Sequence, residues 1–305
     1  MLTRIRNAAA DALMLFVVPC GIALLPWGLG FAVLKRIARS QRLYRTAAEP
    51  AWQAARAHAP DCDEREWKYR FRLLRLVDHA DVYLTLLRGK RWRRRHLVES
   101  GAWPALPGPY LLLTYHWGSG NFIWPRLREL GIDAHFIARR AEGRALGMTR
   151  LSYWFGNFRA RALRWCGSAG PIFVGASAGE IANVLDAGHS IVGMLDLPSR
   201  PDQRGAEVAL LDARVRFPVG LSRIGAEKAI PIVLFSVGLD LTTGARHLRI
   251  ETLPAGLSID ATMQHYAAHL DRRLREQHAY WQIWREAPAM FLPGTGAESK
   301  TQGIQ

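Results

Sequence analysis

From Trp103 to Leu253, short apolar runs alternate along the chain with stretches of helical periodicity. Several of these runs are continuously apolar, as expected of strands that are covered on both faces. Such an alternation favours a parallel sheet with helices packed on it, so we predict an α/β fold with a largely parallel central sheet flanked by helices. The expected strands are 110–115, 134–138, 171–174, 190–195, 208–217, 230–237 and 247–253, and the expected helices are 122–130, 144–166, 180–187, 221–228 and 259–277.

A long amphipathic helix is expected from Glu64 to Leu87, where apolar side chains recur every three or four residues. It is followed by the basic stretch RGKRWRRRH, residues 88–96. Such a stretch can contact anionic lipid headgroups or hold a phosphate-bearing substrate, and it can equally be a solvated charged surface. The sequence leaves these alternatives open.

The segment between Asp11 and Lys35 contains no charged residue. It is long enough to cross a bilayer as a helix, which needs about 20 apolar residues. Pro19 and Pro26 interrupt it, so a kinked helix lying in one leaflet is an alternative, as is a buried core helix. Basic residues follow from Lys35 to Arg45, which predicts that the bulk of the chain lies on the cytoplasmic side. We therefore expect an N-terminal membrane-anchor helix.

These features predict three parts of the chain. Residues 1–45 form the anchor and its basic flank, residues 46–292 form the α/β domain, and residues 293–305 form a disordered tail. The 3 cysteines, Cys20, Cys62 and Cys166, are too few and too far apart for a disulfide framework or a zinc site.

The chain is strongly basic, with 41 Lys and Arg against 26 Asp and Glu. Such a balance favours polyanionic partners, namely nucleic acid, an anionic membrane or phosphorylated substrates. Nucleic acid is not the expected partner, because the cations flank a hydrophobic segment and the chain carries no nucleic-acid recognition motif.

The stretch LLLTYHWGSGNF, residues 111–122, places His116 where an apolar strand ends and a turn of small residues begins. Ligands of α/β sheets bind at the carboxyl ends of strands, and a histidine there can act as a general base near neutral pH. Gly118 and its neighbours allow a substrate to approach the backbone closely. Asn121, at the start of the next helix, can orient the ring as an amide does in papain-like proteases. The alternative is a histidine that only satisfies a hydrogen bond at the strand end.

Several stretches resemble the late acyltransferases of lipid A biosynthesis, the lauroyl and myristoyl transferases of Gram-negative inner membranes. The resemblance covers nearly the whole chain. It is carried by LLPWGLGFAVLKRIAR, LLLTYHWGSGNF, HFIARR, the central block from LDAGHSIVG through FPVG to IPIVLFSV, and the closing AYWQIWREAP.

The resemblance implies an O-acyltransferase of lipopolysaccharide biosynthesis, attached to the cell inner membrane with its catalytic domain on the cytoplasmic side. The donor would be a thioester of acyl carrier protein or acyl-CoA. The acceptor would be a hydroxyl of a lipid or glycolipid, such as a lipid A precursor. No metal or cofactor is implied.

The resemblance also implies roles for individual residues. His116 would be the general base, and Asn121 would hold its ring. Arg139 would bind substrate phosphate or offset the developing oxyanion charge, with Asp196 positioning Arg139 or the acceptor. Gly118 and Arg140 are expected to contact the substrate.

Asn121 departs from the family motif, which places Asp or Glu five positions after the histidine. A carboxylate stabilises the imidazolium that forms in the transition state, whereas a neutral amide only orients the ring. Either Asn121 contacts His116 directly, which the retained spacing favours, or another carboxylate such as Asp196 supplies the charge.

A rival motif is GASAG, residues 175–179, which matches the nucleophile elbow of α/β-hydrolases with Ser177 as nucleophile. An expected strand precedes it and an expected helix follows it, and Asp240 and His265 lie downstream as potential partners. A serine esterase or lipase is therefore the alternative function, and an ordinary strand-to-helix turn is the alternative structure.

Overall fold

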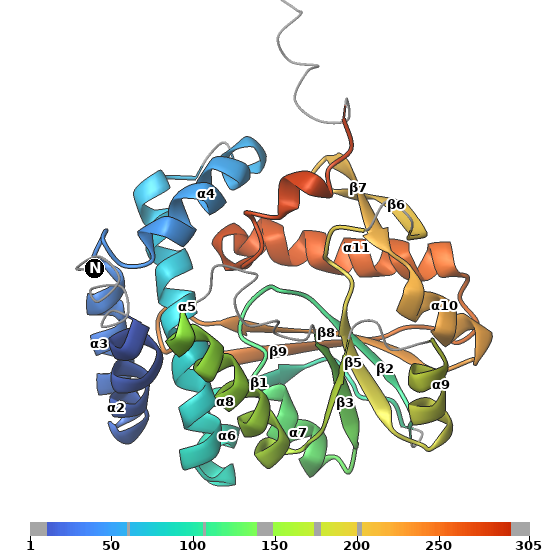
Figure 1. Ribbon diagram of the computed structural model, residues 1–305, viewed down its shortest axis with the longest axis horizontal. Coiled ribbons are helices and arrows are strands. Elements are labelled where there is room, and N and C mark those ends of the chain that lie inside the picture. Colours follow the sequence, from blue (N-terminus) through green and yellow to red (C-terminus); the bar gives the residue numbers. More distant parts are fainter. Residues whose placement is uncertain are drawn as a thin grey trace, which may run out of the picture.

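The computed structural model describes residues 11–59, 62–105, 108–138, 149–173, 178–199 and 203–293. A central sheet of seven strands is flanked by helices, and a two-stranded hairpin stands apart from it (Figure 1). The strands are β1 (Leu97–Ser100), β2 (Leu111–Thr114), β3 (Ala134–Ala138), β4 (Ser168–Phe173), β5 (Ser190–Met194), β6 (Gly205–Leu210), β7 (Ala213–Pro218), β8 (Ile232–Leu239) and β9 (Arg246–Thr252).

The helices are α2 (Val18–Leu24), α3 (Trp27–Ala38), α4 (Arg45–Ala55), α5 (Glu64–Leu87), α6 (Lys90–His96), α7 (Ile123–Glu129), α8 (Arg150–Cys166), α9 (Ala178–Asp186), α10 (Gly220–Glu227) and α11 (Ile259–Glu276). Shorter turns are η1 (Leu13–Val17), η2 (Arg56–His58), η3 (His278–Tyr280) and η4 (Ala287–Ala289). The helix predicted over residues 64–87 is confirmed at both ends, and Asp63 caps it by accepting from the Glu66 N–H.

The sheet has the strand order β1-β9-β8-β2-β5-β3-β4. Strands β8, β2, β5, β3 and β4 are mutually parallel, while β9 is antiparallel to β8 and pairs in parallel with β1. The predicted α/β class with a largely parallel sheet is therefore confirmed.

Alternate residues of the central strand β2 pack into the two layers of helices. Leu111 and Leu113 belong to the core that includes Tyr266 and Leu270 of α11, whereas Leu112 packs in the core that includes Trp124 of α7. Helices α11 and α7 lie on opposite faces of the sheet (Figure 1). Burial on both faces explains why the strand sequence is continuously apolar.

Two details of the strand prediction were wrong. The single strand expected over residues 208–217 is the hairpin of β6 and β7, which turns at Leu211 and Asp212 with positive φ angles of 51° and 63°. Strand β1 was not predicted, because its residues LVES directly follow the basic stretch and leave only one side chain partly covered.

The N-terminal segment forms η1, α2 and α3, with extended backbone at Leu25 and Pro26 separating the two α-helices. One side of these helices packs on α5, with Trp27, Phe31 and Leu34 buried in the same core as α5. Within the described residues, no helix has both the length and the apolar character to cross a membrane.

Candidate active site

His116 and Asp196 lie on equal extensions of two neighbouring parallel strands. Thr114 of β2 pairs with Met194 of β5, and each of the two site residues follows two positions later. His116 Nδ1 lies 3.0 Å from Asp196 Oδ1, and the backbone N–H of His116 donates to Asp196 Oδ2 at 2.8 Å. The sheet register therefore places a histidine against a carboxylate at the carboxyl edge of the sheet.

The Asp196 carboxylate is fully buried and is held from a third direction by Trp281, whose Nε1–H donates to Oδ2 at 2.8 Å. The ends of the two strands are joined by Tyr266, which donates to the Thr114 carbonyl at 2.8 Å and accepts from the Leu195 N–H at 2.9 Å. The Asp196 carboxylate thus accepts from three donors, the His116 ring, the His116 backbone N–H and the Trp281 ring. These hydrogen bonds compensate for its burial and fix its position.

The His116 side chain is 30% exposed, so its outer edge can be reached from solvent. Because a carboxylate only accepts, Nδ1 carries the proton and Nε2 holds the free lone pair. Burial alone would lower the pKa of His116, but the charge and hydrogen bond of Asp196 outweigh it and raise that pKa above its ordinary value. The pair is therefore arranged to accept a proton at Nε2 and to stabilise the resulting imidazolium.

The prediction that Asn121 orients the His116 ring was wrong. Its Nδ2 group donates to the Asp78 carbonyl at 3.1 Å and to Asp78 Oδ1 at 3.2 Å, on helix α5. Asp196 holds the ring instead. Its predicted role of positioning Arg139 or the acceptor stays a prediction, because Arg139 lies outside the described residues. The second explanation for the missing family acid, in which another carboxylate takes its place, fits this geometry.

Asp78 also holds Arg159 of α8 in a two-point contact, with Nη1 2.6 Å from Oδ2 and Nη2 3.0 Å from Oδ1. The Arg159 side chain is 34% exposed, while that of Asp78 is 4% exposed. The charge of Arg159 acts on His116, where it opposes the rise in pKa that Asp196 causes. Arg159 is thus a cation held in a fixed position, and its charge acts on the His116 ring.

A glycine is required at position 118 because the backbone of β8 passes close to it. Its φ is +79°, and a Cβ there would lie 1.9 Å from the Val237 carbonyl oxygen. Its N–H donates to the Tyr280 carbonyl, and its carbonyl accepts from Gln282 Nε2 at 2.7 Å. Both of its backbone groups are thus hydrogen-bonded within the chain, and the expected contact of Gly118 with a substrate stays a prediction.

A buried ion pair lies under the loop that carries His116. Arg246 and Asp81 are both fully buried and bonded to each other, and Ser119 Oγ donates to Asp81 Oδ2 at 2.6 Å. The Arg246 guanidinium lies between the rings of Trp27 and Phe122, at 4.3 and 4.7 Å from their centroids. This cluster connects the N-terminal helices to the loop after β2.

Several predicted site residues lie outside the described residues, namely Arg139, Arg140 and the proposed nucleophile Ser177 of the rival motif. The structure adds Asp78, Arg159 and Trp281, which sequence reasoning did not identify. Asp78 is a buried carboxylate of α5 that directly follows the buried apolar residues Leu76 and Val77, and this charge at a buried position was the available signal for it. Arg159 carried none, since α8 contains several arginines.

The Asp196–His116 pair and the neighbouring Arg159 are suited to abstracting a proton and stabilising negative charge. No protein-family model matches this chain, and no curated protein matches it either.

Proposed function

We propose that the protein is a membrane-associated O-acyltransferase in which His116 is the general base and Asp196 its partner. The observation that carries the proposal is the buried carboxylate that holds a partly exposed histidine at the carboxyl edge of the sheet. The family resemblance of the sequence supplies the reaction class. The acyl donor would be a thioester of acyl carrier protein or coenzyme A, and the acceptor a hydroxyl of a lipid or glycolipid such as a lipid A precursor.

In this reaction His116 Nε2 takes the proton of the acceptor hydroxyl while the hydroxyl oxygen attacks the thioester carbonyl carbon. The carbon–sulfur bond then breaks, and the imidazolium returns the proton to the departing thiolate. Asp196 stabilises the imidazolium between these steps, as the carboxylate does in histidine-based acyl transfer generally. No covalent acyl-enzyme is required.

Arg159 is assigned the charge-stabilising role among the described residues. Asp78 holds its guanidinium at two points, which leaves the partly exposed side chain without freedom to reorient. A cation fixed in this way can stabilise the oxyanion of the tetrahedral intermediate or a phosphate of the acceptor. Asp78 and Asn121 then act on the reaction through Arg159 rather than through His116.

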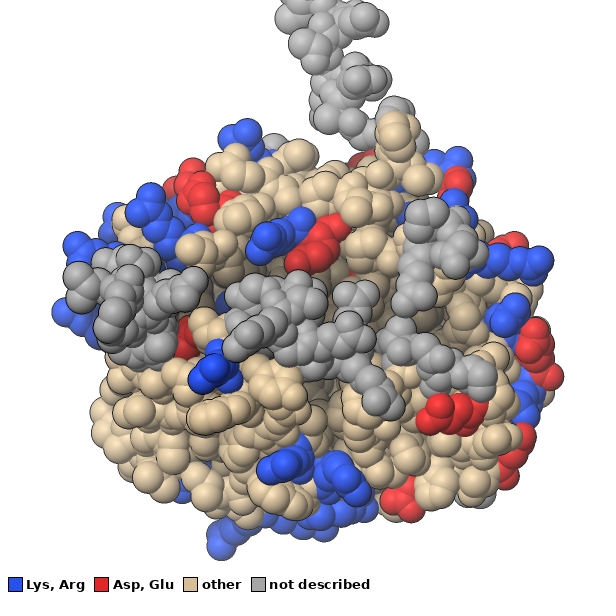
Figure 2. Space-filling model, viewed as in Figure 1, with Lys and Arg blue, Asp and Glu red and all other residues tan. Residues whose placement is uncertain are grey.

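Attachment to the membrane would be interfacial rather than by a long spanning helix. Large apolar side chains are exposed on the N-terminal helices, with Val17 at 62% and Leu24 at 68%, and on α8, with Trp154 and Trp165 both at 62%. Helix α8 packs beside η1 and α5. This part of the surface carries few charged side chains, and Lys and Arg gather along its lower edge (Figure 2). Apolar side chains bordered by cations suit an anionic lipid surface.

The test of the proposal is an acyl-transfer assay on purified protein, with total lipid extract as acceptor and mass spectrometry to detect the gain of one acyl chain. His116→Ala is expected to abolish the product, and Arg159→Gln to reduce it strongly. His265→Ala removes a 44% exposed histidine of α11 and should leave acyl transfer unchanged, whereas the esterase alternative would need this histidine.

The same assay separates the acyltransferase from the esterase alternative. Ser177→Ala should leave most of the activity if His116 acts directly, and the protein should not label with a fluorophosphonate probe. Loss of activity in Ser177→Ala together with probe labelling at Ser177 would overturn the proposal.

A further inference from the structure

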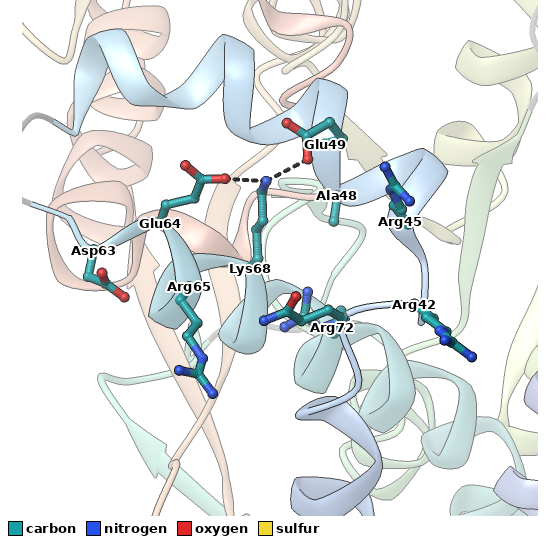
Figure 3. A pocket seen from close by; sticks show the side chains of 10 residues that line it. Arg42, Arg45, Ala48, Glu49, Asp63, Glu64, Arg65, Lys68 and Arg72 are labelled. Carbon is teal, nitrogen blue, oxygen red and sulfur yellow. Dashed lines mark hydrogen bonds and ion pairs between the residues drawn. The ribbon is translucent and has the colours of Figure 1, made fainter.

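A hollow of about 640 Å³ lies between α4, the loop before it and the first turns of α5 (Figure 3). None of the residues that line it belongs to the candidate active site described above. Its walls carry five cationic side chains, those of Arg42, Arg45, Arg65, Lys68 and Arg72. A volume of this order is typical of sites for small molecules the size of a nucleotide.

The carboxylates in the same walls are already engaged. Glu49 and Glu64 both accept from Lys68 Nζ, at 2.6 and 2.5 Å, so that one lysine faces two carboxylates (Figure 3). Asp63 caps α5 by accepting from the Glu66 N–H at 2.7 Å. Within the hollow, Glu49 and Glu64 therefore accept from Lys68, and Asp63 accepts from the first turn of α5.

The four arginines of the hollow differ from Lys68 in this respect. Among the residues that the structure describes, no carboxylate forms an ion pair with Arg42, Arg45, Arg65 or Arg72. Arg72 is the most telling of the four because its side chain is only 3% exposed. Its Nε–H donates to the Ala38 carbonyl at 2.8 Å, which is the one hydrogen bond found for its guanidinium among the described residues.

A buried guanidinium without a counter-charge is costly, because burial disfavours the charged form. Consistent with this, burial lowers the pKa of Arg72. An anion in the hollow would supply the missing acceptor. Planar guanidinium groups bind phosphate oxygens in a two-point fashion, and several of them together favour a ligand with more than one negative charge.

We propose that this arginine pocket, formed by Arg42, Arg45, Arg65 and Arg72, binds a phosphorylated ligand with two or more negative charges. The site does not depend on the proposed acyl transfer. It is joined to the candidate active site by α5, since Arg72 and Asp78 are separated by six residues, or about 9 Å along the helix axis.

Binding is measured by isothermal titration calorimetry of the full-length protein with inorganic pyrophosphate. The wild type is expected to bind saturably. The double variant Arg42→Gln/Arg45→Gln should bind at least about tenfold more weakly, because each substitution removes charge-assisted hydrogen bonds to the ligand. Arg161→Gln is the matched control, since it removes one exposed arginine from α8. It should bind within about twofold of the wild type, a change too small for a lost charge-assisted bond.

Two further variants test the arrangement itself. Glu49→Gln removes one carboxylate from Lys68 and is expected to tighten binding, which a general loss of folding would not do. Arg72→Lys keeps the charge but loses the planar fork, so it should weaken binding while its melting temperature shows that it still folds. Absence of saturable binding by the wild type, or equal weakening in Arg161→Gln, would overturn the proposal.

The phosphate can belong to a soluble metabolite or to a lipid headgroup, and competition separates these sources. Sedimentation with phosphatidic acid vesicles is compared between the wild type and Arg42→Gln/Arg45→Gln, with and without pyrophosphate. If pyrophosphate displaces the wild type and the variant sediments less, the pocket holds a lipid phosphate. If sedimentation is unaffected while calorimetric binding is lost in the variant, the ligand is soluble.

Discussion

Asp196 accepts hydrogen bonds from His116 Nδ1 at 3.0 Å and from the His116 backbone N–H at 2.8 Å. One carboxylate therefore fixes the tautomer of the histidine and the end of the strand that carries it. Because the Asp196 carboxylate raises the pKa of His116, removing this carboxylate should lower that pKa and shift the pH–rate profile in a known direction.

In Asp196→Asn we expect the acidic limb of the kcat/KM profile to move to lower pH, since the free ring loses the charge that raised its pKa. The maximal rate should fall by about 10²–10⁴-fold, the range for loss of general-base catalysis. The measurement is the pH dependence of acyl transfer. An unmoved limb would show that Asp196 is not the working partner of His116.

Trp281→Phe provides a milder version of the same test. It removes the Nε1–H bond to Asp196 Oδ2 but keeps a buried aromatic ring in place. The rate should fall less than in Asp196→Asn, and the folded structure should be retained, as near-ultraviolet circular dichroism can show.

Asn121→Asp distinguishes the observed contacts from the predicted ones. The new carboxylate would face Asp78 in place of an amide that donates to it, so we expect the free energy of unfolding to fall by about 1–3 kcal/mol at pH 7. The acidic limb of the rate profile should stay where it is in the wild type, because Asn121 does not hold the ring. Asn157→Asp, on the exposed side of α8, is the control and should unfold within about 0.5 kcal/mol of the wild type.

The sheet and the position of His116 could be predicted from sequence, because a strand buried on both faces has a distinct apolar signature and its end marks a ligand site. The partner of His116 could not be read from local spacing. Asn121 lies nearby in the chain, yet the residue that reaches the ring is Asp196, eighty positions later. Only the pairing of Thr114 with Met194 brings the two together, and strand order is a property of the whole fold.

Acid should destabilise the protein through buried neutral histidines. Burial lowers the pKa to about 4 for His79, to about 3 for His269 and to about 4 for His278. The folded state then binds fewer protons than the unfolded state as the pH falls from about 6.5 toward 4, so the free energy of unfolding decreases, by about 1.4 kcal/mol per pH unit for each histidine. His116 has a raised pKa and acts with the opposite sign, since its stabilisation is lost as pH rises through that pKa.

In His269→Gln the free energy of unfolding should therefore fall less steeply with decreasing pH, by about 1.4 kcal/mol per pH unit, which is the contribution of one histidine. The measurement is urea unfolding at a series of pH values between 4 and 6.5. His265→Gln, on the same helix but 44% exposed, serves as the control and should leave the slope unchanged. Equal slopes in His269→Gln and the wild type would contradict the assignment.

The exposed tryptophans of α8 provide a test of interfacial attachment. Trp154→Ser/Trp165→Ser is expected to reduce sedimentation with phosphatidylglycerol vesicles several-fold, because both side chains are 62% exposed and amphipathic rings partition into the headgroup region. The folding stability should change little, since exposed rings lose little burial. High salt should weaken the binding that remains through the cations of α6, whereas unchanged sedimentation of the double variant would exclude α8 from the lipid-facing surface.

Finally, the fully buried pair of Asp81 and Arg246 should be far more important to folding than an exposed pair. Arg246→Met leaves the Asp81 carboxylate buried without its cation, which typically costs about 3–5 kcal/mol. Lys228→Met, which breaks the exposed ion pair with Asp186, is the control and should cost at most about 1 kcal/mol. Both are measured by urea unfolding, and equal losses would contradict the importance of burial. Since Ser119 bonds to Asp81 and lies three positions after His116, Arg246→Met should also lower kcat, whereas Lys228→Met should not.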